Sequence, residues 1–477
     1  MYRLSNPILA VLLLCATFAL AVQNVKVQGA DFVNNVTSDR FQIIGVAYQP
    51  GGSDGFNPGS GIDPLSNGTL CLRDAALMQQ LGVNTIRIYN LDPDLNHDDC
   101  VSIFNGVGIY MLIDVNSPLP DQSLDPGNLA SSYSLTYLNH TFAVVEAFKN
   151  YPNTLGFFSA NEVMDTVGTG ATSPPYIRAV TRDIKDYIAK NSPRQIPVGY
   201  SAADVSQILT DSWAYLSCDI NGNSNDPSRS DFFGLNSYSW CGPTSPTANY
   251  EASGYNTLIS TFGNTSIPVF FSEYGCNKVE PRVFDEVPVL YGNMTSVMSG
   301  GLVYEYYEES NDYGLVSFYS NGTSQLLVDY DNLQKQFNTL NVKALESMDS
   351  SATAIKSPSC SSSLISSSGF NNSFTLPAAP SGVSQLIDSG VKNANQGKLV
   401  TVTDTAVTLP VYSVSGSLIN NLAIKLLPND ESNGPNGATT TSSGASPSTT
   451  KKGAAGKIQA GLCGSAAMAI VLAFLLL

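Results

Sequence analysis

The sequence predicts an α/β protein whose main domain, residues 25–345, is a (β/α)8 barrel. Eight short apolar runs rich in strand-forming residues alternate with helical stretches in this part of the chain. The alternative is an open doubly wound sheet, which normally carries a glycine-rich phosphate-binding turn after its first strand. No such turn follows the first run, so the barrel is the better prediction.

The expected strands share a core of large apolar residues. In chain order they are Gln42–Tyr48, Val83–Tyr89, Ile109–Asp114, Thr154–Ala160, Ile196–Tyr200, Phe232–Tyr238, Pro268–Glu273 and Gly301–Tyr306. Helices are expected between them where apolar residues recur at helical spacing or where start and stop signals stand. The clearest are Leu72–Leu81, Tyr133–Asn150, Tyr176–Lys190 and Glu286–Met298.

Three segments of different composition are expected after the barrel. Residues 346–375 are rich in serine and include Cys360. Residues 376–428 regain a strand-like pattern, as in Lys398–Thr403 and Ala406–Tyr412, which predicts a small β-rich appendage. Residues 429–450 are rich in Ser, Thr, Gly and Asn, which is typical of a disordered, O-glycosylated stalk.

Both ends of the chain have the composition of targeting signals. Arg3 precedes an apolar run that ends in the small-x-small site Ala19–Ala21, so residues 1–21 are interpreted as a secretory signal peptide. Residues 451–477 combine a polar spacer with an apolar terminal run, and small-residue triplets stand at 436–438, 444–446 and 453–455. This order predicts a GPI anchor on the extracellular face of the plasma membrane, with a tail-anchored helix as the alternative.

Charge and composition exclude several kinds of chemistry. The formal net charge of −16 disfavours binding to nucleic acid. The only histidines, His97 and His140, are too few for the usual metal sites and catalytic triads. No metal or cofactor is expected, and carboxylates remain as the groups that can carry out catalysis. Nothing in the sequence specifies an oligomeric state.

Cysteines and glycosylation acceptors agree with export. Outside the end signals the cysteines are Cys71, Cys100, Cys218, Cys241, Cys276 and Cys360, which allow three disulfides. Asn-x-Ser/Thr acceptors stand at Asn35, Asn67, Asn139, Asn264, Asn293, Asn321 and Asn371. Glycans at these positions would keep the surrounding loops at the surface.

Two glutamates close apolar strands. Glu162 follows Asn161 at the end of the fourth run, and Glu273 ends the seventh. In a barrel the active site lies at the carboxyl ends of the strands, where two facing carboxylates suit glycoside cleavage. One would protonate the leaving oxygen, and the other would attack the sugar or activate water. A separation of about 5–5.5 Å gives retention and roughly 6.5–9.5 Å gives inversion, a choice that the residues alone leave open.

Other strand ends also suit a sugar. Tyr89, Asp114 and Tyr238 close further runs, and strand alternation would place Tyr304 and Tyr306 on one face. Tyrosine offers carbohydrate an apolar ring and a hydroxyl group. Asn161 is placed to bind the 2-hydroxyl of the sugar, a contact that strengthens in the transition state.

Four motifs together resemble glycoside hydrolase family 72. They are Gly45–Gly52, Ser159–Glu162, Phe271–Lys278 and Gly300–Tyr306. This family contains the GPI-anchored β-1,3-glucanosyltransferases of fungal walls, the Gas/Gel/Phr group. Some members carry a cysteine-rich carbohydrate-binding module after the barrel. Only Cys360 and Cys463 lie beyond residue 276 here, so the chain resembles the subgroup without that module.

The resemblance implies a retaining transferase. Glu162 would be the general acid/base and Glu273 the nucleophile, and a glucosyl-enzyme would pass to the non-reducing end of a second β-1,3-glucan. The implied substrate-binding residues are Gln49, Tyr89, Asp114, Asn161, Tyr238 and Tyr304, the last in preference to Tyr306. The implied disulfides are Cys71–Cys100, Cys218–Cys360 and Cys241–Cys276. Two alternatives stay open: a β-1,3-glucan hydrolase with the same glutamates, and a wall glycoprotein that has lost catalysis.

Overall fold

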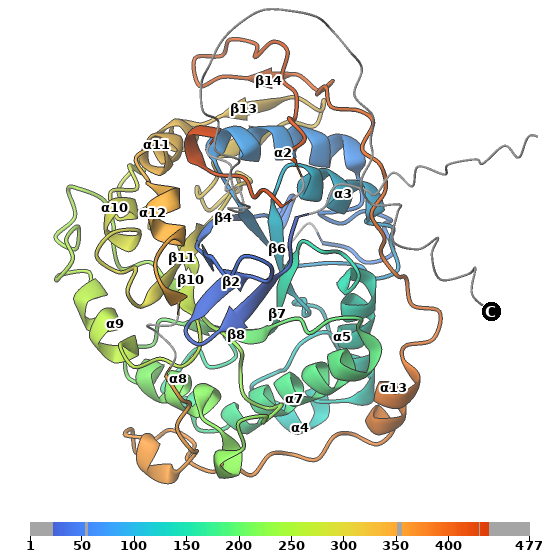
Figure 1. Ribbon diagram of the computed structural model, residues 1–477, viewed down its shortest axis with the longest axis vertical. Helices are drawn as coiled ribbons and strands as arrows, with labels where there is room; N and C mark the ends of the chain where they lie inside the picture. Colours follow the sequence, from blue (N-terminus) through green and yellow to red (C-terminus); the bar gives the residue numbers. More distant parts are fainter. Residues whose placement is uncertain (1–21, 53–55, 351–354, 429, 438–477) are drawn as a thin grey trace, which may run out of the picture. The chain divides into compact units, whose positions relative to one another are not determined.

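Eight parallel strands close into a barrel in the computed structural model, which confirms the predicted fold (Figure 1). The structure describes residues 22–52, 56–350, 355–428 and 430–437. Each strand pairs with its sequence neighbours, and β11 closes the circle on β4. The barrel strands are β4 (Ile43–Ala47), β5 (Thr85–Ile88), β6 (Tyr110–Asp114), β7 (Thr154–Asn161), β8 (Val198–Ala203), β9 (Phe233–Ser237), β10 (Val269–Tyr274) and β11 (Met298–Val303).

Helices surround the barrel, as βα crossovers require. Helix α2 shows why they start and stop where they do: Asn67 Oδ1 accepts from the amides of Thr69 and Leu70, and Gly82 ends the helix in the left-handed conformation. The helices of this part of the chain are α2 (Gly68–Leu81), α3 (Asp98–Gly106), α4 (Leu129–Ser132), α5 (Leu135–Phe148), α6 (Val167–Gly170), α7 (Pro174–Asn191), α8 (Leu209–Ser217), the 3-10 turn η1 (Ile220–Gly222), α9 (Tyr255–Phe262), α10 (Val287–Leu290), α11 (Val328–Phe337) and α12 (Val342–Glu346).

One predicted helix is wrong. The segment Glu286–Met298 contains only the short helix α10, and Met298 already opens β11. Gly292 and Asn293, both poor helix formers, follow the end of α10. The helix therefore ends about two turns earlier than the sequence pattern indicates.

A small antiparallel sheet closes the amino-terminal end of the barrel. It consists of β1 (Val25–Gln28), β2 (Asp31–Asn34) and β3 (Arg40–Phe41), and it lies across the barrel in Figure 1. Phe32 of β2 packs against the rings of Phe232 and Phe270 at centroid distances of 5.8 Å each. Gly199 makes room for this aromatic plug, since a Cβ there would stand 2.2 Å from the Phe232 ring.

The segment after residue 355 does not form the predicted β-rich appendage. Residues 376–428 hold α13 (Val383–Ser389) and the two-residue strand β14 (Val411–Tyr412), which extends a small sheet with β12 (Val316–Phe318) and β13 (Ser324–Leu326). The stretch Lys398–Thr403 forms no strand. Its backbone instead donates to side chains of α3, as from Val400 to Ser102 Oγ at 2.8 Å. Packing on the barrel helices thus satisfies groups that a separate sheet would have paired.

The beginning of the predicted stalk is also ordered. Asn433 is buried, and its side-chain amide donates to the Val83 carbonyl at 2.8 Å. Asn436, in the turn η4 (Pro435–Gly437), donates to the Asn338 carbonyl at 2.6 Å. The predicted signal peptide, residues 438–450 of the stalk and the carboxyl-terminal signal lie outside the described residues.

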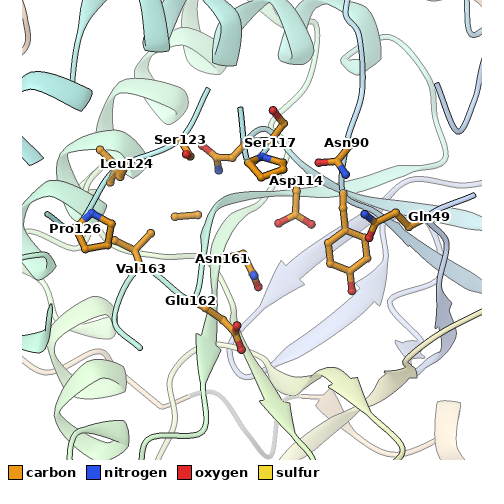
Figure 2. Close-up of a pocket in the computed structure, with 14 residues that line it drawn as sticks. Gln49, Asn90, Asp114, Ser117, Ser123, Leu124, Pro126, Asn161, Glu162 and Val163 are labelled. Carbon is orange, nitrogen blue, oxygen red and sulfur yellow. The ribbon is translucent and has the colours of Figure 1, made fainter. Parts of the chain in front are cut away.

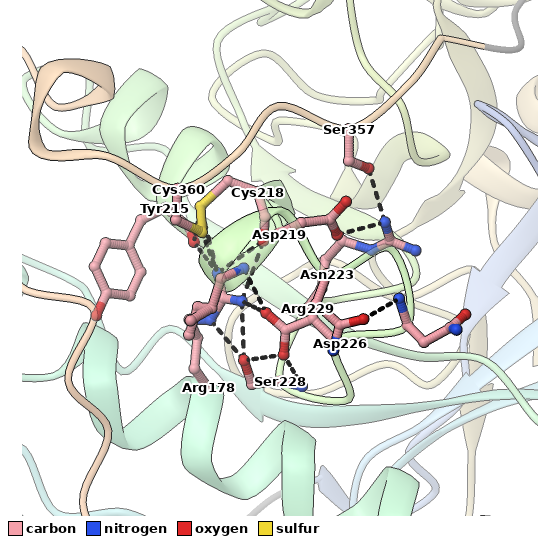
Figure 3. Close-up of polar contacts among 12 residues, drawn as sticks. Arg178, Tyr215, Cys218, Asp219, Asn223, Asp226, Ser228, Arg229, Ser357 and Cys360 are labelled. Carbon is pink, nitrogen blue, oxygen red and sulfur yellow. Dashed lines mark hydrogen bonds and ion pairs between the residues drawn. A yellow bond between two sulfur atoms is a disulfide. The ribbon is translucent and has the colours of Figure 1, made fainter.

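Three disulfides join the cysteine pairs that the resemblance implies: Cys71–Cys100, Cys218–Cys360 and Cys241–Cys276. The second fixes the chain after the barrel to the end of α8 (Figure 3). The buried Arg178 lies beside it, and its guanidinium contacts Asp226 at 2.7 Å and the carbonyls of Tyr215 and Cys218. The turn η3 (Ser362–Leu364) follows this junction.

Candidate active site

The two glutamates predicted as catalytic lie at the carboxyl ends of β7 and β10. Glu273 is the penultimate residue of strand β10 and is buried, whereas Glu162 directly follows β7 and is half-buried. Glu162 has φ of 51°, a left-handed conformation that costs a residue with a Cβ free energy. Its amide is held by the Ser201 carbonyl at 2.9 Å, so the neighbouring strand β8 fixes this conformation.

Arg87 of β5 lies at the centre of the site and is fully buried. Its guanidinium binds both carboxylate oxygens of Asp114, at 2.8 and 3.1 Å. It also contacts Glu273 Oε1 at 3.2 Å and Asn161 Oδ1 at 2.9 Å. Arg87 was not predicted as a site residue, although a charge inside an apolar strand indicates a buried partner.

Two tyrosine hydroxyls complete the surroundings of Glu273. Tyr89 donates to Oε1 at 3.0 Å and Tyr238 to Oε2 at 2.7 Å. Burial raises the pKa of Glu273 above its ordinary value, while Arg87 and both hydroxyls oppose that rise and the nearby Glu162 adds to it. Burial likewise raises the pKa of Asp114 against the opposing effect of Arg87. Arg87 and the two hydroxyls therefore offset part of the cost of removing the Glu273 carboxylate from water.

Asn236 of β9 holds Glu162 in place and was also missed from the sequence. Its Nδ2 donates to Glu162 Oε1 at 2.9 Å and to Asn161 Oδ1 at 3.2 Å. Its Oδ1 accepts from the hydroxyls of Ser201 and Ser272, at 3.0 and 2.8 Å, which fixes the orientation of the amide. Glu162 is thus held by a donor whose own position is set by two buried serines.

A cavity of about 320 Å³ opens beside these groups (Figure 2). We call it the catalytic cavity. Figure 2 shows Asp114, Asn161 and Glu162 in the middle of the view, between Leu124 and Val163 on the left and Gln49 and Asn90 on the right. Four of the residues predicted to bind substrate line it: Gln49, Tyr89, Asp114 and Asn161.

Tyr304 and Tyr238 stand next to this cavity with Tyr313. The Tyr304 ring lies 6.5 Å from that of Tyr89, 6.3 Å from that of Tyr238 and 5.4 Å from that of Tyr313. Tyr313 follows no strand and was missed for that reason. The tyrosines form an aromatic wall beside Glu273, the kind of surface on which a sugar ring packs.

The expectation that Tyr304 and Tyr306 share a face is wrong. Strand β11 ends at Val303, so strand alternation does not extend to these residues. Tyr306 is fully buried, and its hydroxyl donates to Asp74 Oδ1 at 3.0 Å behind the barrel wall. Of the two tyrosines, only Tyr304 contacts the residues of the site.

The described residues contain neither a metal-ligand cluster nor a membrane-spanning helix. No group of three or more His, Cys, Asp or Glu side chains lies in an arrangement that would hold a metal ion within this part of the chain. No helix of the described ranges has both the length and the apolar composition needed to cross a bilayer.

A barrel with paired carboxylates at its fourth and seventh strand ends, walled by tyrosine, defines the class of glycoside-cleaving enzymes. Within that class, the chain belongs to glycoside hydrolase family 72, described as glucanosyltransferases, whose family model matches residues 15–341.

Its relatives include the Aspergillus fumigatus 1,3-beta-glucanosyltransferase gel2, 54% identical over 88% of this chain and 86% of the relative. The probable 1,3-beta-glucanosyltransferase GAS3 of Saccharomyces cerevisiae is 46% identical over 81% of this chain and 75% of its own length. The solved structure of Saccharomyces cerevisiae Gas2p in complex with laminaripentaose superposes with a TM-score of 0.66 at 34% identity. The matched region covers 76% of this chain and 78% of the Gas2p chain.

Proposed function

We propose that this protein is a β-1,3-glucanosyltransferase that cleaves an internal linkage of one β-1,3-glucan and joins the new reducing end to the non-reducing end of another. Its relatives carry this activity in their names, and Gas2p was solved with a β-1,3-gluco-oligosaccharide. The observation that carries the proposal is Glu273, held by Arg87, Tyr89 and Tyr238 beside the cavity that Glu162 lines.

Glu273 is the nucleophile in this proposal. Arg87 and the tyrosine hydroxyls favour its ionised form, which must attack the anomeric carbon. The attack breaks the bond to the leaving oxygen and leaves a glucosyl ester on Glu273. As negative charge leaves the carboxylate, these donors keep the side chain in place for the second step.

Glu162 is the general acid/base. It protonates the leaving oxygen in the first step and takes a proton from the attacking 3-hydroxyl in the second. Its half-buried position at the cavity suits a group that must meet successive sugar hydroxyls. Asn161 uses its Oδ1 to accept from Arg87 and Asn236, which leaves its amide nitrogen for the 2-hydroxyl of the substrate.

Transfer rather than hydrolysis requires that an acceptor sugar reaches the ester before water does. Gln49, Asn90 and Asn116 line the catalytic cavity and offer amides to the hydroxyls of such an acceptor. We assign Tyr304 and Tyr238 to the wall of the same site.

An extracellular position at the membrane, through a GPI anchor, is part of the proposal, and the cell wall is its alternative destination. The end signals support it, as do three disulfides and the exposure of most glycan acceptors. Six of the seven acceptor asparagines are exposed. Asn371 is half-buried and its Nδ2 donates to the Ala171 carbonyl at 3.1 Å, so we expect the least glycan there.

A product-length profile tests the function. The protein, ended at residue 442, is incubated with a reduced β-1,3-gluco-oligosaccharide, and chain lengths are followed by mass spectrometry. Products longer than the starting sugar are expected. Shorter products alone, even at high sugar concentration, would make the protein a hydrolase, and no products at all would favour a wall protein without catalysis.

A further inference from the structure

Two rings of the aromatic wall stand on one loop. Tyr304 directly follows β11, and Tyr313 lies three residues before β12. We call residues 304–315 the wall loop. The backbone amide of Glu305 donates to the Tyr313 carbonyl at 3.0 Å, which brings the two ends of this loop together. A loop that presents rings to a ligand at a fixed place needs contacts that hold its backbone.

Arg282 supplies such contacts and is only 2% exposed. Its Nη1 donates to the Tyr304 carbonyl at 2.6 Å, and its Nη2 donates to the Tyr313 carbonyl at 2.5 Å. Nη1 also donates at 3.2 Å to the carbonyl of Gly275, two residues after Glu273. A guanidinium offers five donors in a fixed plane, so it can bind three carbonyls at once. One side chain therefore ties both ends of the wall loop to the turn that follows β10.

Helix α11 holds Arg282 from the other side. Asp329 accepts from the guanidinium Nε at 2.6 Å and from the Arg282 amide at 3.1 Å. Asn332, three residues further along the helix, donates to the Arg282 carbonyl at 2.7 Å. The guanidinium also lies 5.6 Å over the Tyr313 ring. Because its main chain and its side chain are both held, Arg282 sets the place of the wall loop relative to the barrel.

The contacts of Arg282 make it a support for the site and not a part of its charge network. Asp329 neutralises its charge at 2.6 Å, and Arg282 does not line the catalytic cavity. The cation that lowers the pKa of Glu273 is Arg87. Strand β10, which carries Glu273, is paired with β9 and β11 along its length, so it keeps its place without Arg282.

We propose that Arg282 is a positioning residue of the transfer reaction, which holds Tyr304 and Tyr313 where a sugar ring can pack on them. The inference rests on the proposed function, because the wall loop matters for activity only if a glucan binds beside Glu273. Loss of the guanidinium loosens the wall loop and leaves both glutamates in place. Substrate binding therefore weakens, while bound substrate reacts at nearly the same rate.

The test measures Arg282→Lys and the wild type on a reduced β-1,3-gluco-oligosaccharide. Lysine keeps the charge opposite Asp329 but presents a single nitrogen, so it does not hold both ends of the wall loop. KM should rise about five- to tenfold, the loss expected for a weakened aromatic contact, with kcat within about twofold. The acidic limb of kcat/KM should not move. That limb separates Arg282 from Arg87, which acts on the nucleophile itself.

Arg178→Lys is the matched control. Arg178 is also a fully buried guanidinium, paired with Asp226 at 2.7 Å and bound to the carbonyls of Tyr215 and Cys218 (Figure 3). It contacts no residue of the aromatic wall. Its replacement should lower the urea midpoint of unfolding, as Arg282→Lys does, and leave KM unchanged. An equal rise of KM in both variants would mean that lost stability alone explains the effect, and the inference would fail.

A double-mutant cycle shows whether Arg282 acts through the wall. Arg282→Lys should raise KM by a smaller factor in Tyr304→Ala than in the wild type, because one of the rings that it positions is already missing. Equal factors in the two backgrounds would contradict the inference.

Asp329→Asn provides a second variant if Arg282→Lys does not fold. It weakens the hold on the guanidinium and should raise KM in the same direction with the acidic limb unmoved. An unchanged KM in every folded variant, while the wild type still lengthens its substrate, would overturn the inference and leave the proposed function intact. Products no longer than the substrate in the wild type would instead refute the proposed function itself.

Discussion

The two ends of the barrel are built from the same eight strands but hold opposite kinds of side chain. At the amino-terminal end, Phe32, Phe232 and Phe270 form a dry aromatic plug. At the carboxyl end, Arg87 and Glu273 belong to a buried network of charges and amides. In this fold the amino-terminal end of the barrel is expected to contribute stability and the carboxyl-terminal end to carry the chemistry.

Phe158 marks the boundary between the two ends. Its ring lies 5.3 Å from that of Phe232 in the plug, and the Arg87 guanidinium lies 4.4 Å over it. The plug therefore forms the low-dielectric floor of the catalytic network. Burial on this floor strengthens the interaction of Arg87 with its carboxylates and raises the pKa of Glu273 at the same time.

The largest expected effect is at the chemical end. Glu162→Gln and Glu273→Gln keep the size of the side chain but can neither transfer the proton nor attack the sugar. Each should lower the transfer rate by at least about 10²–10⁴-fold, with little change in the urea midpoint of unfolding. The exposed Glu251→Gln is the control. Turnover near that of the wild type in either variant would remove that glutamate from the mechanism.

Arg87→Gln should shift the pH dependence of activity. The pKa of Glu273 is raised by burial and lowered by Arg87, so loss of the guanidinium raises it further. Because the nucleophile must be ionised, the acidic limb of kcat/KM moves to higher pH. Arg87→Lys keeps the charge and should leave the limb near its wild-type position. An unmoved limb in Arg87→Gln would contradict the role given to Arg87.

Phe32→Ala should have the opposite effect to the glutamate substitutions: it should lower stability and leave activity nearly unchanged. Phe32 is fully buried in the plug, and its loss should lower the free energy of unfolding by about 3–5 kcal/mol. Urea unfolding measures this loss, while kcat/KM per folded molecule should stay within about twofold because the network is untouched. A large drop in kcat/KM with unchanged stability would show that the two ends are not independent.

The smallest expected effects distinguish two tyrosines of one motif. Tyr304→Ala removes part of the aromatic wall and should raise KM by about tenfold. Tyr306→Phe removes one buried hydrogen bond to Asp74 and should cost about 1 kcal/mol of stability with KM unchanged. Steady-state transfer kinetics and urea unfolding of both variants check this. Reversed effects would mean that Tyr306 is the residue of the site.

The sequence predicts those parts of the fold and site that depend on local pattern. Each barrel strand is an apolar run, and Glu162 and Glu273 can be found because they end such runs. Arg87 and Asn236 were missed because their importance lies in partners far along the chain, as in the contact from Arg87 to Glu273. Strand patterns do not show those partners.

Two of the incorrect predictions have a common physical cause. Residues 398–403 alternate like a strand but are satisfied by contacts with α3, and Tyr306 follows the strand alternation only in the sequence. In each case tertiary packing, which no local pattern contains, decided the outcome.

The central claim is that Glu273 forms a covalent bond to the sugar while Glu162 acts as acid/base. The direct measurement is to trap this ester. The protein is incubated with a 2-fluoro-glucosyl donor that carries a good leaving group, which slows the second step, and its peptides are analysed by mass spectrometry. We expect one added 2-deoxy-2-fluoroglucosyl mass on the peptide that contains Glu273 and none in Glu273→Gln. A label on Glu162, on Asp114 or on no carboxylate would contradict the account.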